Sequence, residues 1–221
     1  MFSENNLKEI SRSQKTTLCN IMNSHFSDKG NGHHNYTKLY YQLFQNKQNL
    51  PLKILEIGIG SVNPSIPSNM CGGPLGINYT PGGSIKGWLD FFPNAEIYCC
   101  DVDTDILNFT DDPRVHSFYL DQTNEEQIKS ILNNIISNVN FDIIIDDGLH
   151  LCPVNFNVMK LLLPNLKRDG YYIIEDIIDR EYSYLYIDFE SLQNRNYQYV
   201  RLPNPDNTID NNLFIVYPKL T

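Results

Sequence analysis

The chain has 221 residues, of which 41% are hydrophobic and 19% charged, an ordinary balance for one globular α/β domain. Its net charge of −9 argues against a nucleic-acid phosphate backbone as the main ligand. No apolar run approaches the roughly 18 residues of a membrane span, and the N-terminus lacks a signal peptide's apolar core. The five cysteines show no zinc-type spacing, so free thiols in a reducing cytoplasm are the simplest interpretation.

The first 48 residues predict a helical cap that includes a polar loop. Apolar residues recur at helical spacing over 1–24, a glycine-containing polar loop follows at 27–37, and a further helix is predicted over 38–45. We expect residues 1–48 to form a cap with a lid segment, and residues 49–221 to form the main domain.

Strand and helix patterns alternate through the middle of the chain, which predicts an α/β, doubly wound, Rossmann-like sheet that is mostly parallel. Two final strand patterns flank a turn rich in Pro, Asn and Asp, and they predict an antiparallel hairpin at the sheet edge. Ser84 is the expected N-cap of the first helix of this domain. Strands are predicted at 52–57, 96–102, 115–120, 141–146, 171–175, 197–202 and 213–217, and helices at 84–92, 124–136 and 153–166.

A glycine turn, residues 56–60, follows the first strand of the predicted sheet. Its two glycines suit a tight turn, but a third is missing at the dinucleotide-binding spacing. Gly83 supplies that close approach if residues 61–83 are an insertion. Asp101 lies 18 residues beyond Gly83, near the ~20 expected for a ribose-binding carboxylate. Ordinary loop glycines and a solvated Asp101 are the alternatives, and Asp103 is a second candidate for the ribose.

Two carboxylate pairs, Asp146-Asp147 and Glu175-Asp176, directly follow isoleucine-rich strands. The carboxyl ends of parallel strands are where ligands bind, so these pairs are expected at one rim. Four carboxylates there repel one another unless a cation or proton neutralises them, and carboxylate oxygens suit Mg²⁺. His150 beside such a cation can take a proton from a hydroxyl that the metal acidifies. Solvated acids, and a His150 that caps the next helix, are the alternatives.

These residues together resemble a class I S-adenosylmethionine-dependent methyltransferase, and within that superfamily the metal-dependent sugar O-methyltransferases of the macrocin and mycinamicin type. The loop that contains 28–30 and 33–36 is similar to the N-terminal lid of that group. Leu149 stands where the group has a small serine, and the chain is shorter than the macrolide enzymes, so the substrate is expected to differ. The resemblance rests on Leu55–Gly58, Gly82–Trp88 with Phe92-Pro93, Asp101–Asp103, Asp121-Gln122, Asp146–His150 and Ile174–Asp176.

The resemblance implies methyl transfer from S-adenosylmethionine to a hydroxyl of a small-molecule acceptor, namely a sugar, nucleotide-sugar or glycan. Natural-product or capsule and surface-glycan biosynthesis is the implied setting, and a homo-oligomer is compatible with it. Asp147, Glu175 and Asp176 would hold Mg²⁺, with His150 as general base beside Asp147. His33, His34 and Tyr36 are expected at the substrate. Cofactor contact is expected of Glu56, Gly58, Gly83, Ser84, Asp101, Asp121 and Asp146.

Other functions stay open at this point. A metal-independent methyltransferase acting on another small acceptor, such as a phosphoramidate, would keep the cofactor site and ignore EDTA. A nicotinamide-dependent oxidoreductase would share the glycine turn and Asp101, but no catalytic Tyr/Lys pair is evident. A non-enzymatic protein would bind the cofactor without turnover. The series Tyr182, Tyr184 and Tyr186 predicts either a strand or the wall of an acceptor pocket.

Overall fold

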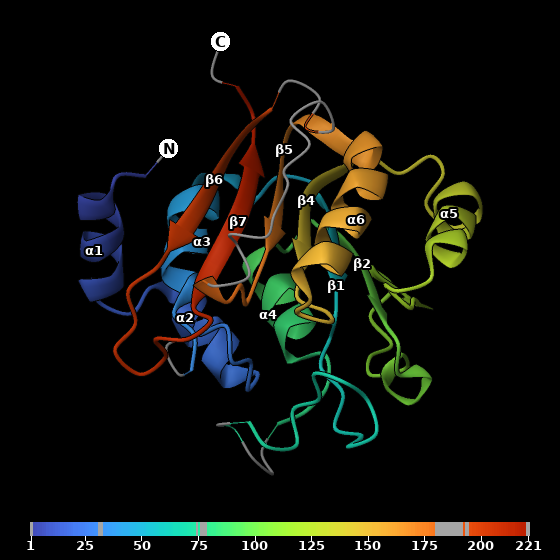
Figure 1. Cartoon of the computed structure of the whole chain (residues 1–221), viewed down its shortest axis with the longest axis horizontal. Helices are drawn as coiled ribbons and strands as arrows, with labels where there is room; N and C mark the ends of the chain where they lie inside the picture. Colours follow the sequence, from blue (N-terminus) through green and yellow to red (C-terminus); the bar gives the residue numbers. More distant parts are fainter. Residues whose placement is uncertain are drawn as a thin grey trace.

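A seven-stranded sheet runs through the computed structural model of the chain (Figure 1). The structure describes residues 2–30, 33–73, 75, 79–179, 192 and 195–219, and the Tyr182, Tyr184 and Tyr186 series lies outside this part. In sheet order the strands are β3 (Val115–Tyr119), β2 (Glu96–Asp101), β1 (Lys53–Ile57), β4 (Phe141–Asp146), β5 (Leu166–Ile174), β7 (Asn212–Tyr217) and β6 (Asn196–Arg201).

Strands β1 to β5 are parallel to one another, whereas β7 runs antiparallel to both β5 and β6. The predicted fold class, a doubly wound and mostly parallel sheet with a C-terminal antiparallel hairpin, is therefore confirmed. The hairpin inserts its second strand, β7, beside β5, so that β6 forms the edge. Continuous apolar strands suit a sheet whose two faces are both covered by helices.

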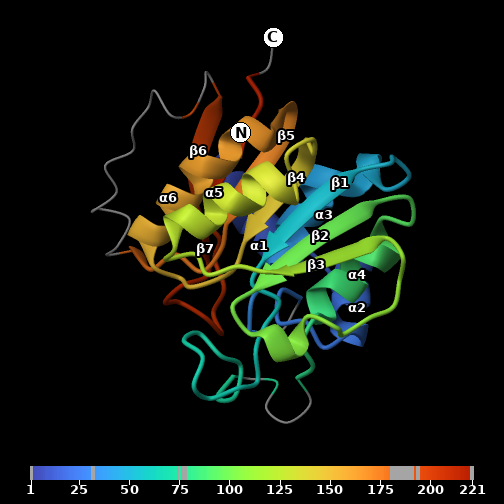
Figure 2. The same cartoon turned by 90° about the vertical axis from the view of Figure 1, so that its right-hand side faces the viewer.

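Helices cover both faces of the sheet (Figure 2). Successive strand residues point to opposite faces, so Ile54 belongs to one core cluster and Leu55 to the other. The first cluster contains residues of both the N-terminal helices and the sheet. The domain boundary expected between residues 48 and 49 stays a prediction. The helices of the first layer are α1 (Glu4–Arg12), α2 (Thr17–Ser24), α3 (Tyr36–Phe44) and α4 (Gly83–Phe91), and those of the second are α5 (Glu125–Asn134) and α6 (Cys152–Leu162).

Three predicted helices differ from the observed ones. The helix expected over 1–24 is two helices, because Ser13 is extended and Thr16 caps α2 by accepting from the Cys19 amide. Ser84 is not an N-cap, because Gly82, in the left-handed region with φ 74°, precedes α4. The helix expected over 153–166 stops at Leu162. A 3₁₀ turn with a proline follows it, and proline cannot continue the α-helical hydrogen bonds. Two further short 3₁₀ segments among the described residues are Gln45–Lys47 and Thr104–Ile106.

The N-terminal residues pack against the C-terminal hairpin. Phe2 donates its amide to Gln198 Oε1 at 3.0 Å, and Gln198 Nε2 donates to the Phe2 carbonyl at 2.7 Å. The side chain of Asn204 in the β6–β7 connection donates to the carbonyl of His33 at 2.8 Å. Segments almost two hundred positions apart in sequence are therefore neighbours in the structure.

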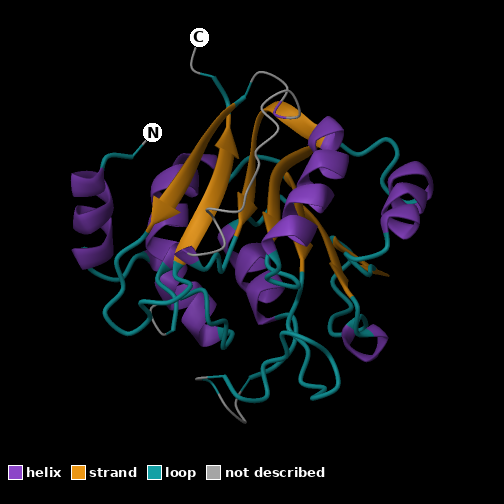
Figure 3. Ribbon diagram, in the orientation of Figure 1, coloured by secondary structure: helices purple, strands orange, loops and turns teal. Residues whose placement is uncertain are grey.

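The carboxyl ends of the parallel strands lie together on one side of the molecule, and the segment that follows β1 lies on the same side (Figure 3). Gly58 and Gly60 both have positive φ, at 83° and 81°, so the chain turns sharply as it leaves β1. Among the helices described, none has the length and apolar character of a membrane span. The sheet edge at these strand ends is where the candidate site is formed.

Candidate functional site

A cavity of about 530 Å³ opens at the carboxyl ends of β1, β2 and β4. This volume falls in the range of small-molecule and cofactor sites. The wall includes the glycine turn and carboxylates at or just after the ends of four different strands, β2 to β5. The predicted site residues that line it are Gly58, Ser84, Asp101, Asp121, Asp147, His150 and Asp176.

Asp101 fastens the glycine turn as well as lining the cavity. Its Oδ2 accepts the Ile59 amide and its Oδ1 accepts the Asp103 amide, both at 2.9 Å. Burial raises the pKa of Asp101 above its ordinary value, although these amide bonds lower it. The carboxylate is thus held at a fixed place beside the turn, which is what recognition of ligand hydroxyls requires.

Glu56 does not line the cavity, in contrast to the expected cofactor contact. Its carboxylate accepts from Ser84 Oγ and from Trp88 Nε1, both at 2.6 Å, and the residue is fully buried under α4. Gly83 does not line the cavity either. It faces the chain after α2 instead, where a Cβ would lie 2.5 Å from the carbonyl oxygen of His25. Both residues position the start of α4: Glu56 by hydrogen bonds and Gly83 by permitting close packing of the chain that follows α2.

Asp146 is also behind the cavity wall. Its Oδ1 accepts from Gln122 Nε2 at 2.7 Å and from Asn155 Nδ2 at 2.9 Å. Burial raises the pKa of Asp146 to about 6, while these two bonds lower it. Gln122 also accepts the Leu149 amide at 2.8 Å. Asp146 therefore ties together the loops on either side of the rim, and the structure gives it no direct place beside a ligand.

Asp147, His150 and Asp176 converge at the rim. His150 Nδ1 lies 3.5 Å from Asp176 Oδ2, and His150 Nε2 lies 4.0 Å from Asp147 Oδ1. His150 and Asp176 both have φ 56°, a strained conformation for residues other than glycine and one often found at functional sites. Burial lowers the pKa of His150, but the carboxylates of Asp176 and Asp147 together raise it by more, so the pKa lies above its ordinary value. The predicted acid–imidazole set is assembled here.

Glu175 points away from this set and toward Lys29, a residue for which no individual role was predicted. The Lys29 ammonium lies 2.5 Å from Glu175 Oε2 and 3.5 Å from Glu56 Oε1, and it also contacts Asp147 Oδ2. Burial opposes the charge of Lys29, but the three carboxylates raise its pKa well above the ordinary value. Burial raises the pKa of Glu175 well above its own ordinary value. A buried cation thus already occupies part of the acidic rim.

Two tyrosines of α3 complete the acidic rim from the N-terminal side. Tyr36 donates its hydroxyl to Asp176 Oδ1 at 2.7 Å, and Tyr40 donates to Glu175 Oε1. His34 Nε2 lies 3.6 Å from Asp176 Oδ1. Tyr36 and His34, both predicted at the substrate, are therefore in contact with Asp176 instead of lining the cavity.

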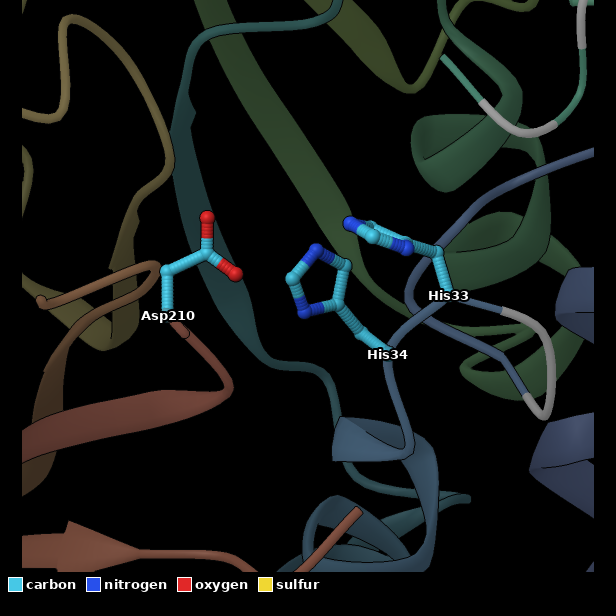
Figure 4. Close-up of side chains that lie close together, drawn as sticks. All are labelled: His33, His34 and Asp210. Carbon is cyan, nitrogen blue, oxygen red and sulfur yellow. The ribbon is translucent and has the colours of Figure 1, made fainter. Parts of the chain in front are cut away.

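His33, His34 and Asp210 form a second group of possible metal ligands (Figure 4). They come from the loop before α3 and from the β6–β7 connection. The amide nitrogen of Asn207 lies among them, 3.2 Å from His33 Nε2, 3.4 Å from His34 Nδ1 and 2.7 Å from Asp210 Oδ1. An amide of the protein itself thus bridges the three side chains, so the arrangement is explained as a polar contact between the two loops.

Comparison with known proteins gives a consistent group of relatives, although no family model matches the chain. A tetracenomycin-type rhamnosyl 3'-O-methyltransferase from Streptomyces olivaceus is 30% identical over 154 residues, which cover 69% of this chain and 35% of the relative. Mycinamicin VI 2''-O-methyltransferase from Micromonospora griseorubida is 28% identical over 166 residues, covering 75% and 37% respectively. The chain thus spans about a third of the length of these curated relatives.

Among solved structures, the MycE methyltransferase of the mycinamycin biosynthetic pathway, in complex with Mg and SAH, aligns with a TM-score of 0.65. It is 25% identical, and the alignment covers 93% of this chain and 55% of MycE. Seven strands in the order 3-2-1-4-5-7-6 with an antiparallel seventh strand are the class I S-adenosylmethionine-dependent methyltransferase fold. The chain has this fold and is related to the macrocin- and mycinamicin-type sugar O-methyltransferases.

Proposed function

We propose that the protein transfers a methyl group from S-adenosylmethionine to a hydroxyl of a sugar or sugar-linked small molecule. One observation carries the proposal: the cavity at the strand ends adjoins an imidazole held between two carboxylates, Asp147 and Asp176. Cofactor and base would therefore face the same acceptor. The family relationship supports the reaction class, because the relatives named above are methyltransferases that act on glycosylated compounds.

The donor set at the rim fits a hard divalent cation. Atoms of Asp147, His150 and Asp176 lie within 4.8 Å of one another, and His150 Nδ1 is buried without a hydrogen-bond partner. Carboxylate oxygens are the ligands that Mg²⁺ prefers, so Asp147 and Asp176 would hold it, with Glu175 joining them once released from Lys29. Direct cofactor contact is proposed for Gly58, Ser84, Asp101 and Asp121.

The side chains divide the chemistry among them. S-adenosylmethionine would supply the electrophilic methyl group and Mg²⁺ would acidify the acceptor hydroxyl. Asp176 Oδ2, 3.5 Å from His150 Nδ1, would favour a proton on Nδ1 by its negative charge, which would leave Nε2 free to take the hydroxyl proton. Tyr36 fixes Asp176 in turn by its hydrogen bond. Asp101 holds the glycine turn against the cofactor site.

The acceptor is proposed as a class rather than as one compound. The names of the two relatives refer to a rhamnosyl-tetracenomycin compound and to mycinamicin VI. Neither name refers to a capsule or surface glycan. A nucleotide-sugar or glycan acceptor stays a prediction, as does a homo-oligomer. Leu149 and Leu151 line the cavity close to His150, so an acceptor with an apolar face beside its reacting hydroxyl suits this wall.

The test combines binding with turnover. Calorimetry should show binding of S-adenosylhomocysteine to the folded protein, and a panel of glycosides should identify an acceptor. EDTA should abolish methyl transfer, and added Mg²⁺ should restore it. Folded protein that binds neither S-adenosylmethionine nor S-adenosylhomocysteine would refute the proposed function.

His150→Ala should reduce methyl transfer by roughly 10²–10⁴-fold, the usual loss for a general base. Affinity for S-adenosylhomocysteine should stay nearly unchanged, because the imidazole would act on the acceptor proton and not on the nucleoside. Steady-state kinetics and calorimetry on the same sample measure both quantities. Normal turnover by the variant would remove His150 from the proposed mechanism.

One observation favours a second candidate, a metal-independent methyltransferase. Lys29 already places a positive charge among Asp147, Glu175 and Glu56, and an ammonium can stabilise negative charge that develops on an acceptor oxygen. The two candidates differ in one measurement, since full activity in EDTA favours the metal-independent one.

A further inference from the structure

Lys29 contacts two of the three carboxylates proposed to hold the metal, Asp147 and Glu175. Its ammonium contacts carboxylates from three strand ends: Glu56 of β1, Asp147 after β4 and Glu175 after β5. The side chain is only 2% exposed, so water does not screen these contacts. A single side chain from the N-terminal segment therefore offsets part of the negative charge of the acidic rim.

The oxygens of Glu175 are both engaged. Oε2 accepts from the Lys29 ammonium at 2.5 Å, and Oε1 accepts from the Tyr40 hydroxyl. Asp147 gives its Oδ2 to Lys29 and turns only Oδ1 toward His150. Glu175 can therefore ligate a metal ion only after Lys29 or Tyr40 releases it, and Asp147 can use both oxygens only after Lys29 leaves.

Electrostatics makes simultaneous occupancy unfavourable. A divalent ion bound to the same carboxylates would lie within a few ångströms of the ammonium, in surroundings where repulsion between like charges is strong. The backbone around Lys29 is held in place: its amide donates to Ser27 Oγ at 3.3 Å, and its carbonyl accepts the Thr37 amide at 3.1 Å. The long flexible side chain is thus the part that can withdraw.

We propose that Lys29 and a divalent cation compete for Asp147 and Glu175, so that metal binding expels the Lys29 ammonium from the rim. This inference rests on the proposed function, because it concerns the metal of that reaction. Lys29 is then a positioning residue: it keeps the carboxylates together without metal and sets the metal concentration at which the site loads. It also links the segment between α2 and α3 to the state of the site.

The first experiment measures Mg²⁺ affinity by calorimetry in the full chain. Lys29→Met removes the charge but keeps an unbranched stem, and it should bind Mg²⁺ roughly tenfold or more tightly than the wild type, the factor that corresponds to losing one charge-assisted contact. Lys38→Met is the matched control. Lys38 is also a buried lysine of the N-terminal segment, but its ammonium bonds the carbonyls of Ser11 and Ser13 instead of carboxylates. Its Mg²⁺ affinity should equal that of the wild type.

The second readout is the fluorescence of Trp88, the single tryptophan of the chain. Trp88 Nε1 donates to Glu56 Oε2, and Glu56 Oε1 lies 3.5 Å from the Lys29 ammonium. Mg²⁺ should change Trp88 emission in the wild type with the midpoint found by calorimetry, since the charge beside Glu56 departs. The change should be much smaller in Lys29→Met, from which that charge is already missing.

Equal or weaker Mg²⁺ binding by Lys29→Met would overturn the inference, because the ammonium would then not compete with the metal. S-adenosylhomocysteine binding is measured on the same samples and shows that each variant is folded. If the wild type and Lys29→Met both bind S-adenosylhomocysteine but neither binds Mg²⁺, the competition and the metal requirement both fail while the methyltransferase proposal stands. Loss of S-adenosylhomocysteine binding by the wild type itself would instead refute the proposed function.

Discussion

At the residue scale, Gly58 shows how closely the strand ends approach one another. A Cβ at this position would lie 2.1 Å from the carbonyl oxygen of Asp147, and φ is 83°. Any side chain would push apart the ends of β1 and β4, and so displace the residue that begins the acid–imidazole set. The sequence predicted a tight turn here, but not that the opposing backbone carries Asp147.

Gly58→Ala should therefore lower the free energy of unfolding by at least about 1–3 kcal/mol, the usual cost of a strained backbone position. Denaturant unfolding measures the change. Gly72→Ala is the control, because an added Cβ there meets no atom within 4 Å, and surface substitutions of this kind stay within about 0.5 kcal/mol. Equal stability of the two variants would contradict the close approach.

Residue roles at the strand ends were predictable only in part. Asp147, His150 and Asp176 meet as expected, because their position after isoleucine-rich strands fixes them at the rim. Glu56 and Asp146 occupy the same strand ends, yet their side chains turn into the buried layers, which strand alternation alone does not reveal. The partnership of Lys29 with Glu175 joins residues 146 positions apart. No local pattern around Lys29 predicts such a contact.

At the element scale, capping decides where the N-terminal helices end. Thr16 has an extended backbone, and its side chain accepts a hydrogen bond from the Cys19 amide at 3.2 Å, so a second helix, α2, begins at Thr17. The helical spacing of apolar residues continues across Thr16, so one helix was predicted over 1–24 where the structure has two. Strands were predicted more accurately, because runs of isoleucine and aromatic residues bounded by polar turns leave less choice.

Thr16→Ala should cost about 1 kcal/mol of unfolding free energy, the typical value of an N-cap side chain. Thr16→Ser should retain most of it, since a serine hydroxyl makes the same bond. Thermal or denaturant unfolding compares the three proteins. Alanine and serine variants of equal stability would show that the Thr16 cap contributes nothing.

Three exposed titratable side chains, Lys53, Glu96 and His116, link the neighbouring strands β1, β2 and β3. Glu96 lies 2.9 Å from both Lys53 Nζ and His116 Nε2. The hydrogen bond from Lys53 is the main reason that the pKa of Glu96 lies below its ordinary value of 4.5. A carboxylate with a lowered pKa in the folded state stabilises the fold above its unfolded pKa, and this contribution disappears as the pH falls through the folded value.

Glu96→Gln should therefore lower the free energy of unfolding at pH 7 by about 0.2–1 kcal/mol, the range for exposed ion pairs. The difference from the wild type should shrink as the pH falls below 4.5, and also at high salt, which screens exposed charges. Urea unfolding at several pH values measures it. A difference that persists at low pH and high salt would point to packing instead of charge.

At the scale of the whole molecule, the proposed cofactor site is lined by the segments that follow β1 to β5. A ligand that binds only the folded state stabilises it by about 2.7 kcal/mol when its concentration is one hundred times its dissociation constant. S-adenosylhomocysteine should therefore raise the unfolding temperature in proportion to the logarithm of its concentration. NAD should leave the temperature unchanged, and a larger rise with NAD would favour the oxidoreductase alternative.

The contact between the first helices and the last hairpin also has a consequence for synthesis on the ribosome. Phe2 and His33 leave the exit tunnel long before their partners Gln198 and Asn204, which follow them by 196 and 171 positions. The contacts of Phe2 and His33 with the hairpin region therefore form only after the intervening chain is translated, and contacts of such long range form slowly. Nascent chains stalled before β6 should thus bind holdase chaperones through their N-terminal third, and release them only when the hairpin emerges.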